Sequence, residues 1–293
     1  MPSGIIIVDK PSGWTSQDVA SKLRGVFRER RVGHGGTLDP MATGVLPVFV
    51  GRATRAAEYF ESAEKEYEAA LRLGVVTDTQ DVEGRVLETR PAAPREALES
   101  VLPRFRGPIE QLPPMYSAVK IGGRKLYELA RAGKDAERKA RPVTIFALEL
   151  LGERPGPDGT PDYLLRVRCS KGTYIRTLCH DIGAALGCGG CMAALRRTVA
   201  GRYALADAHP LAEIVAAADP SALLLPVDSL FSELPARTLP PDALERCRNG
   251  ADIPLPGLTP GRYRVYGPDG GFLMVGRAEN GALKTEKSFF EVT

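Results

Sequence analysis

The chain of 293 residues lacks several features that would place it in a specialised class of protein. No apolar run approaches the ~20 residues that a transmembrane helix needs, and the first residues lack the basic start and apolar segment of a secretory signal. The five cysteines form an odd number, which argues against a framework of disulfides. An apolar fraction of 43% and a charged fraction of 26% fit a soluble globular protein. We therefore expect a cytoplasmic protein of one or two domains with reduced thiols.

Metal-binding patterns are also scarce. Cys188 and Cys191 have the spacing of half a zinc site, but a second cysteine pair is absent and His180 is only a loose candidate to complete one. Structural zinc sites use four ligands. The acidic loop at residues 77–84 does not follow the calcium-binding pattern of EF-hands, because its glycine is misplaced. We therefore predict no metal.

The net charge is small, at +3, but it is unevenly distributed. Residues 104–141 contain ten Lys and Arg against four Asp and Glu, which gives this window +6 and leaves −3 for the rest of the chain. A second basic cluster surrounds Glu29 and consists of Lys22, Arg24, Arg28, Arg30 and Arg31. Concentrated positive charge is what a phosphate backbone attracts. A solvated charged surface would give the same pattern, so both interpretations stay open.

Residues 33–46 form the most distinctive stretch of the sequence and read Gly-His-Gly-Gly-Thr-Leu-Asp-Pro-Met-Ala-Thr-Gly-Val-Leu. Its glycines allow tight turns and the close approach of a ligand, while Pro40 restricts Asp39 to extended backbone angles. The lysine of a phosphate-binding loop is missing. From the residues alone, the stretch is either an ordinary turn before a strand or a loop that presents the Asp39 carboxylate.

Apolar periodicity and turn residues predict the elements around this loop. We expect helices at residues 17–27 (capped by Thr15 or Ser16), 53–63, 94–101 and from Thr173, as the cap, to about 186. The expected strands are residues 4–8, 65–73, 141–151 and 163–169, with Tyr67 on the apolar face of the second. Residues 226–230 mark a domain edge, and the short strands 262–266, 272–277 and 283–290 predict a small β-barrel. A plain β-module is the alternative for this last part.

Five segments between about residues 5 and 201 resemble, in order, the motifs of the TruB family of bacterial tRNA pseudouridine-55 synthases. They are residues 10–16 (Lys-Pro-Ser-Gly-Trp-Thr-Ser), 33–46, 65–73, 170–178 (Ser-Lys-Gly-Thr-Tyr-Ile-Arg-Thr-Leu) and 192–201. The resemblance implies an α+β catalytic domain at residues 1–230, with a mixed, mainly antiparallel sheet flanked by helices and loops. It also implies an RNA-gripping insertion at about residues 104–141, called the thumb below. A PUA-like RNA-binding β-barrel would occupy residues 234–293.

The resemblance also implies roles for particular side chains. Asp39 matches the family's nucleophile, Arg176 matches the arginine that pairs with it, and Tyr67 matches the tyrosine that stacks on the target base near its reacting carbon. His34 would fill the space that the flipped base leaves, and Lys10 would support the loop. The substrate-binding residues implied in this way are His34, Tyr67, Tyr174, Leu195, Lys10, Lys120, Arg124 and Lys125.

The activity implied is the isomerisation of uridine 55 in the T-loop of tRNA to pseudouridine, by base flipping, detachment of uracil, rotation and reattachment through C5. Such an isomerisation requires no cofactor. We expect Arg176 to lower the pKa of the Asp39 carboxyl and keep it ionised at neutral pH. Whether Asp39 bonds to C1′, attacks C6 of the base or deprotonates C2′ stays open. The expected partner is the tRNA T-arm, bound by a monomer without a membrane, a guide RNA or an obligatory protein partner.

Three rival functions remain. A guide-RNA-dependent relative would share the catalytic motifs, and an RNA-binding or tRNA-folding protein would have only incidental chemistry. A hydrolase using Asp39 and Arg176 is disfavoured, because no general acid stands out at a recognisable spacing.

Overall fold

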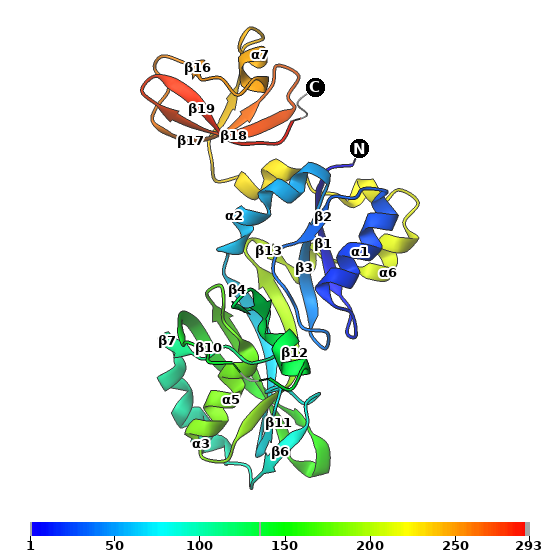
Figure 1. Ribbon diagram of the computed structural model, residues 1–293, viewed down its shortest axis with the longest axis vertical. Helices are drawn as coiled ribbons and strands as arrows, with labels where there is room; N and C mark the ends of the chain where they lie inside the picture. The colour runs from blue at the N-terminus through cyan, green and yellow to red at the C-terminus, as the bar shows by residue number, and fades with distance from the viewer. Residues whose placement is uncertain (1, 135, 291–293) are drawn as a thin grey trace.

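The computed structural model describes residues 2–134 and 136–290, and within these ranges the chain builds one large sheet and one small curled sheet (Figure 1). The large sheet has the order β14-β1-β3-β12-β4-β11-β10-β7, with β2 attached to β3 and β13 to β12. Its strands are β1 (Gly4–Lys10), β2 (Val32–His34), β3 (Thr43–Val50), β4 (Lys65–Leu73), β7 (Gly107–Gln111), β10 (Arg141–Pro155), β11 (Pro161–Cys169), β12 (Gly190–Ala200), β13 (Tyr203–Ala204) and β14 (His209–Pro210). Only the β1–β14 and β3–β12 pairings are parallel among these strands. The predicted mixed, mainly antiparallel sheet is confirmed.

Short helices flank the sheet. The α-helices are α1 (Ser16–Phe27), α2 (Ala57–Glu61), α3 (Arg95–Val101), α4 (Leu126–Arg131), α5 (Ile175–Ala185), α6 (Leu211–Ala216) and α7 (Ala243–Arg248). Short 3₁₀-helices are η1 (Gly51–Ala56), η2 (Leu102–Phe105), η3 (Pro157–Gly159), η4 (Leu205–Asp207), η5 (Pro220–Leu223) and η6 (Val227–Phe231). In the described part of the chain, none of these helices has the length and apolar character to cross a membrane.

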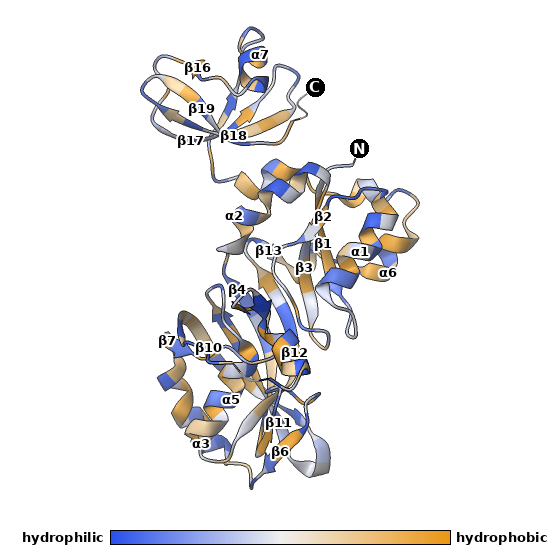
Figure 2. Ribbon diagram, in the orientation of Figure 1, coloured by the Kyte–Doolittle hydropathy of each residue, from blue (hydrophilic) through white to orange (hydrophobic). Residues whose placement is uncertain are grey.

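Helix α1 begins where the sequence predicts. The Thr15 hydroxyl accepts a hydrogen bond from the Asp18 amide at 3.0 Å, and the Asp18 carboxylate accepts one from the Thr15 amide at 3.0 Å. This reciprocal capping box satisfies amides that the first turn leaves free. Figure 2 shows the mixed polar and apolar surface of this helix beside the apolar strands of the sheet. Its buried side, with Val19 and Leu23, therefore packs onto the sheet.

Strand β4 carries the predicted alternation. Tyr67, Ala69, Leu71 and Leu73 all belong to one buried core on the face of the sheet that helices α1 and α5 cover. Since successive side chains of a strand point to opposite faces, this register brings Tyr67 to the same side as those helices.

One predicted helix differs in type and bounds, and the predicted cap of another is wrong. The expected helix at residues 53–63 is a 3₁₀ turn, η1, followed by the short α2. Helix α5 has Tyr174, not Thr173, at its N-cap position; the Thr173 hydroxyl instead donates to the Ser170 carbonyl at 2.9 Å. The Gln111 side chain takes over the capping, because its oxygen accepts from the Tyr174 amide at 2.9 Å.

The thumb divides into a part within the sheet and a part that projects from it. Residues 107–111 form the edge strand β7, which pairs with β10. The projecting part, residues 112–140, contains the hairpin of β8 (Lys120–Ile121) and β9 (Arg124–Lys125) and helix α4. A second small hairpin, β5 (Val75–Thr77) and β6 (Val86–Thr89), frames the acidic loop.

The small curled sheet near the C-terminus has the order β15-β17-β18-β19-β16 (Figure 1). Its strands are β15 (Ala236–Thr238), β16 (Ile253–Pro254), β17 (Gly261–Tyr266), β18 (Phe272–Glu279) and β19 (Ala282–Ser288). It has its own core around Val265, Met274 and Leu283. The rings of Phe231 and Phe272, with centroids 6.1 Å apart, join it to the preceding part of the chain. The predicted α+β class is confirmed.

Candidate active site

The structure brings Asp39 and Arg176 into direct contact, although they are 137 residues apart in sequence. Asp39 lies in the loop between β2 and β3, and Arg176 is the second residue of α5. The two side chains form a bidentate pair, with Nε of Arg176 2.9 Å from Oδ2 of Asp39 and Nη2 3.1 Å from Oδ1. Such a fork-to-fork pair fixes orientation as well as charge.

The remaining donors of Arg176 also have acceptors. Nη1 donates to the carbonyl of Thr79 at 3.2 Å, and Nη2 donates to the carbonyl of Tyr116 at 2.8 Å. The Asp81 carboxylate lies 3.8 Å from Nη1. A cation in the first turn of a helix opposes the helix dipole, so these acceptors together explain why Arg176 is stable there while only 5% exposed.

The pKa of the Asp39 carboxyl differs from the sequence expectation. Burial raises the pKa of the Asp39 carboxyl, and the Asp81 carboxylate adds to this, while the Arg176 guanidinium opposes both. The expected lowering of the pKa is wrong, because the protein displaces water around the carboxyl although 32% of the side-chain surface stays exposed. A carboxylate with a raised pKa and few water partners is a stronger base than an ordinary aspartate.

The turn after β1 and the start of α1 are hydrogen-bonded to the Asp39 loop. The Ser16 hydroxyl accepts from the Leu38 amide at 2.8 Å, and the Gly13 amide donates to the Pro40 carbonyl at 2.9 Å. Nζ of Lys10 donates to the carbonyls of Pro11 (2.9 Å), Trp14 (2.6 Å) and Pro40 (3.1 Å). Burial lowers the pKa of Lys10 to about 8, although Asp39 opposes this. An ammonium group has three N–H donors, so Lys10 is fully engaged in positioning the loop.

Arg197, a buried arginine for which the sequence predicted no role, is hydrogen-bonded to the other side of the Asp39 loop. Arg197 is only 1% exposed; its Nε donates to the Val45 carbonyl at 2.7 Å and its Nη2 to the Gly36 carbonyl at 3.2 Å. These two carbonyls flank the loop that carries Asp39. The alternation of side chains along β12 places Arg197 on the same face as Leu195. From the sequence alone, however, an arginine on a strand is interpreted as exposed to solvent.

Tyr67 and Leu195 lie on the neighbouring strands β4 and β12 and belong to the same core. They are 8% and 7% exposed, so each presents only a small surface. Burial raises the pKa of the Tyr67 hydroxyl, with Arg197 opposing and Asp39 adding to the rise. Tyr67 is therefore a neutral phenol at neutral pH, and it lies within electrostatic reach of the catalytic candidate Asp39.

The other predicted residues lie around this centre. His34 pairs through its backbone with Val48; burial and Arg197 lower the pKa of its imidazole, and its Nδ1 is buried without a hydrogen-bond partner among the described residues. Tyr174 is half-buried at the start of α5. The thumb residues Lys120, Arg124 and Lys125 lie on the β8–β9 hairpin, and in the described structure they contact neither Asp39 nor Arg176.

Comparison with known proteins shows that most of the chain matches one protein family. Residues 24–175 match the N-terminal domain of TruB family pseudouridylate synthases, and residues 176–232 match the C-terminal domain of tRNA pseudouridylate synthase B. The tRNA pseudouridine synthase B of Dechloromonas aromatica (strain RCB) is 45% identical over 293 residues, covering 99% of this chain and 96% of that protein. That of Pseudomonas aeruginosa (strain UCBPP-PA14) is 45% identical over 282 residues, covering 94% and 91%.

Solved structures agree with the sequence matches. A chain in a Cbf5–Nop10–Gar1 complex is 28% identical with a TM-score of 0.71, covering 99% of this chain and 85% of that one. A chain in an H/ACA RNP bound to a substrate RNA containing 2′-deoxyuridine is 25% identical, also with a TM-score of 0.71, covering 99% and 86%. The fold and the buried carboxylate–arginine site thus define an enzyme, a pseudouridine synthase. The chain belongs to the TruB family of pseudouridylate synthases.

Proposed function

We propose that this enzyme converts uridine 55 in the T-loop of tRNA to pseudouridine and does so without a guide RNA. The observation that carries the proposal is the bidentate Asp39–Arg176 pair, set in a loop that is hydrogen-bonded from both sides. Relatives named tRNA pseudouridine synthase B, about 45% identical over nearly the whole chain, support tRNA as the substrate.

In the proposed reaction the Asp39 carboxylate promotes cleavage of the bond between C1′ and N1 of a flipped uridine, as carboxylates do at other sugar carbons. Tyr67 and Leu195 hold the detached uracil while it rotates. C5 then joins C1′, the C5 proton is lost and N1 gains a proton, so reactant and product have the same atoms. We assign the Tyr67 hydroxyl to relaying the C5 proton: it accepts this proton as it gives up its own toward solvent, so the phenol is neutral before and after the step.

RNA binding would use surfaces outside this centre. His34 would occupy the space in the T-loop that the flipped base leaves, at an extrusion cost of a few kcal/mol. Lys120 and Arg124 are exposed on the thumb hairpin and suit phosphates. We assign the curled sheet of residues 234–293 to a PUA-like domain that binds the same RNA, and we propose that the enzyme acts as a monomer.

The test uses purified protein with two bare tRNA transcripts, one with uridine and one with cytidine at position 55. Mapping of pseudouridine should find it at position 55 of the first transcript and nowhere in the second. The Asp39→Asn variant should form none, yet bind the first transcript within a few-fold of the unchanged protein. A requirement for an added guide RNA, modification of a different uridine or an active Asp39→Asn variant would each refute part of the proposal.

A further inference from the structure

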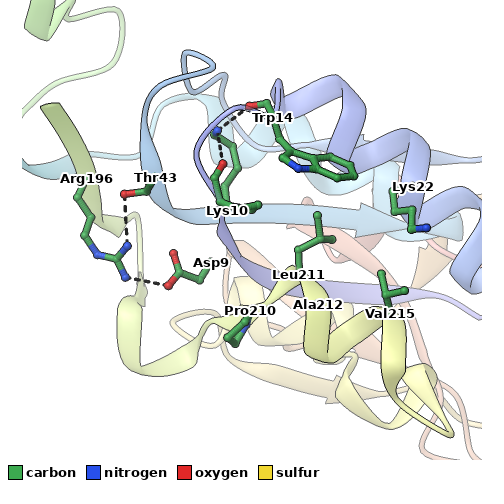
Figure 3. A pocket seen from close by; sticks show the side chains of 11 residues that line it. Asp9, Lys10, Trp14, Lys22, Thr43, Arg196, Pro210, Leu211, Ala212 and Val215 are labelled. Atoms are coloured by element: carbon green, nitrogen blue, oxygen red, sulfur yellow. Dashed lines mark hydrogen bonds and ion pairs between the residues drawn. The ribbon is translucent and has the colours of Figure 1, made fainter.

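A pocket of about 500 Å³ lies beside the catalytic loop, between the turn after β1, helix α1 and helix α6 (Figure 3). The reaction proposed above does not use it. Its volume is within the range of about 300–1,000 Å³ that is typical of small-ligand sites.

One wall of the pocket is apolar and includes the only tryptophan of the chain. Trp14 is 36% exposed and Val215 on α6 is 39% exposed, with Leu211 between them in the lining (Figure 3). Large apolar side chains at this exposure are unusual in the described structure, where most lie in a core. A partly exposed indole beside aliphatic side chains suits a flat ring, because every base can stack on an aromatic side chain.

The two ends of the pocket differ in charge. Lys22 lies at one end, exposed and without an ion pair among the described residues. At the other end Arg196 binds Oδ2 of Asp9 at 2.8 Å and the Thr43 hydroxyl at 3.3 Å. The Asp9–Arg196 pair is neutral overall, and in the described structure Oδ1 of Asp9 has no hydrogen bond. The pocket therefore offers a cation for a phosphate and an acceptor for an amino group.

We propose that this pocket binds one unpaired adenine or cytosine nucleotide of the tRNA substrate. The base stacks on Trp14, its exocyclic amino group donates to Asp9, and its phosphate lies beside Lys22. The identification of the RNA as tRNA rests on the proposed function. Charge complementarity favours a nucleotide over an apolar peptide, because Lys22 and the Asp9 oxygen would stay unpaired against a peptide's side chains.

The pocket is also tied to the catalytic loop. Nζ of Lys10 donates both to the carbonyl of Trp14, which lines the pocket, and to the carbonyl of Pro40, which follows Asp39. A nucleotide stacked on Trp14 would thus lie against the turn that supports the Asp39 loop, while the backbone contacts of this turn stay the same. The ammonium group of Lys10 therefore contacts both the pocket and the Asp39 loop.

The first experiment follows the fluorescence of the single tryptophan during titration with AMP, IMP and UMP, and it needs neither tRNA nor activity. AMP should quench saturably, with a Kd on the order of 1 mM, and more tightly than IMP, which carries an oxygen where AMP has its amino group. Lys22→Gln should weaken AMP binding several-fold, and Asp9→Asn should abolish the preference for AMP over IMP. Linear quenching, equal for all three nucleotides and unchanged in both variants, would overturn the proposal.

The second experiment compares Trp14→Ala with Trp14→Phe on the tRNA transcript. Stacking worth about 1–3 kcal/mol per base predicts a KM raised about 5- to 150-fold in Trp14→Ala. The expected kcat stays within a few-fold, and Trp14→Phe, which keeps a ring, restores most of the loss. An unchanged KM in a folded Trp14→Ala or an equal loss in Trp14→Phe would contradict stacking. Saturable AMP binding by a protein that fails to modify position 55 would leave the pocket standing and refute only the proposed function.

Discussion

The guanidinium of Arg176 donates to the carbonyl of Tyr116 at 2.8 Å and also binds both carboxylate oxygens of Asp39. Tyr116 belongs to the projecting part of the thumb, and its carbonyl is the contact between that segment and the catalytic pair. The side chain of Arg176 therefore contacts both the thumb and Asp39. If the thumb binds RNA as proposed and moves when it does so, it must either carry Arg176 with it or release this hydrogen bond, and RNA binding would then affect the orientation of Asp39.

Replacing Arg176 by Lys should impair catalysis far more than binding. Lysine keeps the charge but cannot bind both oxygens of Asp39 and two carbonyls at once. Misplacement of a reacting group by about 1 Å costs on the order of 10²-fold in rate, so we expect kcat for pseudouridine formation to fall by about that factor. Single-turnover assays give the rate, and filter binding should show tRNA affinity within about threefold. An equal loss of affinity would mean that Arg176 binds RNA directly.

The raised pKa of Asp39 predicts an acid limb in the pH profile of kcat/KM. In the proposed reaction the carboxylate is the active form, so activity should fall as pH decreases through a value above that of an ordinary aspartate. Asp81 raises this pKa and Arg176 lowers it. Asp81→Asn should therefore move the limb to lower pH, and Arg176→Gln should move it to higher pH. Shifts in the same direction would show that the limb belongs to another group.

Local patterns in the sequence predicted most elements near the site. Strand β4 occupies the predicted residues 65–73, because its alternation of apolar and polar side chains matches a half-buried strand. Of the two caps that the sequence offered for α1, Thr15 and Ser16, the structure uses Thr15. The helix expected at residues 53–63 is helical over Gly51–Glu61, but its first part is the 3₁₀-helix η1.

The geometry of the site depends on contacts between residues far apart in the sequence, and no local sequence pattern predicts such contacts. The pairing of Asp39 with Arg176 was implied by a family resemblance, since nothing near either residue specifies the other. Arg197 was missed, because a strand pattern does not distinguish a buried arginine bound to two carbonyls from an exposed one. The sign of the Asp39 pKa shift was also missed, since it depends on how much water the folded chain displaces.

Gly44 should not tolerate a side chain. Its φ is +100°, and a Cβ atom there would lie 2.2 Å from the carbonyl oxygen and 2.8 Å from the amide nitrogen of Arg197. Backbone strain of this kind costs about 1–3 kcal/mol, and the clash adds to it, so Gly44→Ala should lower the free energy of unfolding by at least that amount. Gly33→Ala is the matched control, because its Cβ would meet open space. Urea denaturation of both variants measures the difference, and equal stabilities would contradict the packing described here.

Arg197→Met should loosen the Asp39 loop, because the buried guanidinium binds the carbonyls on both sides of it. The Gly36 and Val45 carbonyls lose their donor, so kcat should fall while tRNA affinity stays within about threefold. The Arg197 charge also lowers the pKa of His34, so the variant should raise it. NMR titration can follow this directly, since the chain has only three histidines. His180 and His209 serve as internal controls, and an unmoved His34 would show that the cation does not act on the loop.

Neutralising Lys120, Arg124 and Lys125 together should weaken tRNA binding and flatten its salt dependence. Lys120 and Arg124 are exposed on the thumb hairpin, and Nζ of Lys125 lies 5.4 Å from the centroid of the Tyr127 ring. Each phosphate contact contributes about 0.7–0.9 to the slope of log K against log salt, so three lost contacts should reduce the slope by about 2.

The control for this thumb variant is a second triple variant with the same loss of charge, made of Arg85→Gln, Arg90→Gln and Arg95→Gln. Each of these arginines already has a carboxylate partner, in Asp78, Glu88 and Glu99 respectively. Their charge is thus largely compensated, and the salt slope of this variant should stay unchanged. Equal slopes for the two triple variants would show that general net charge, rather than the thumb, determines the attraction of RNA.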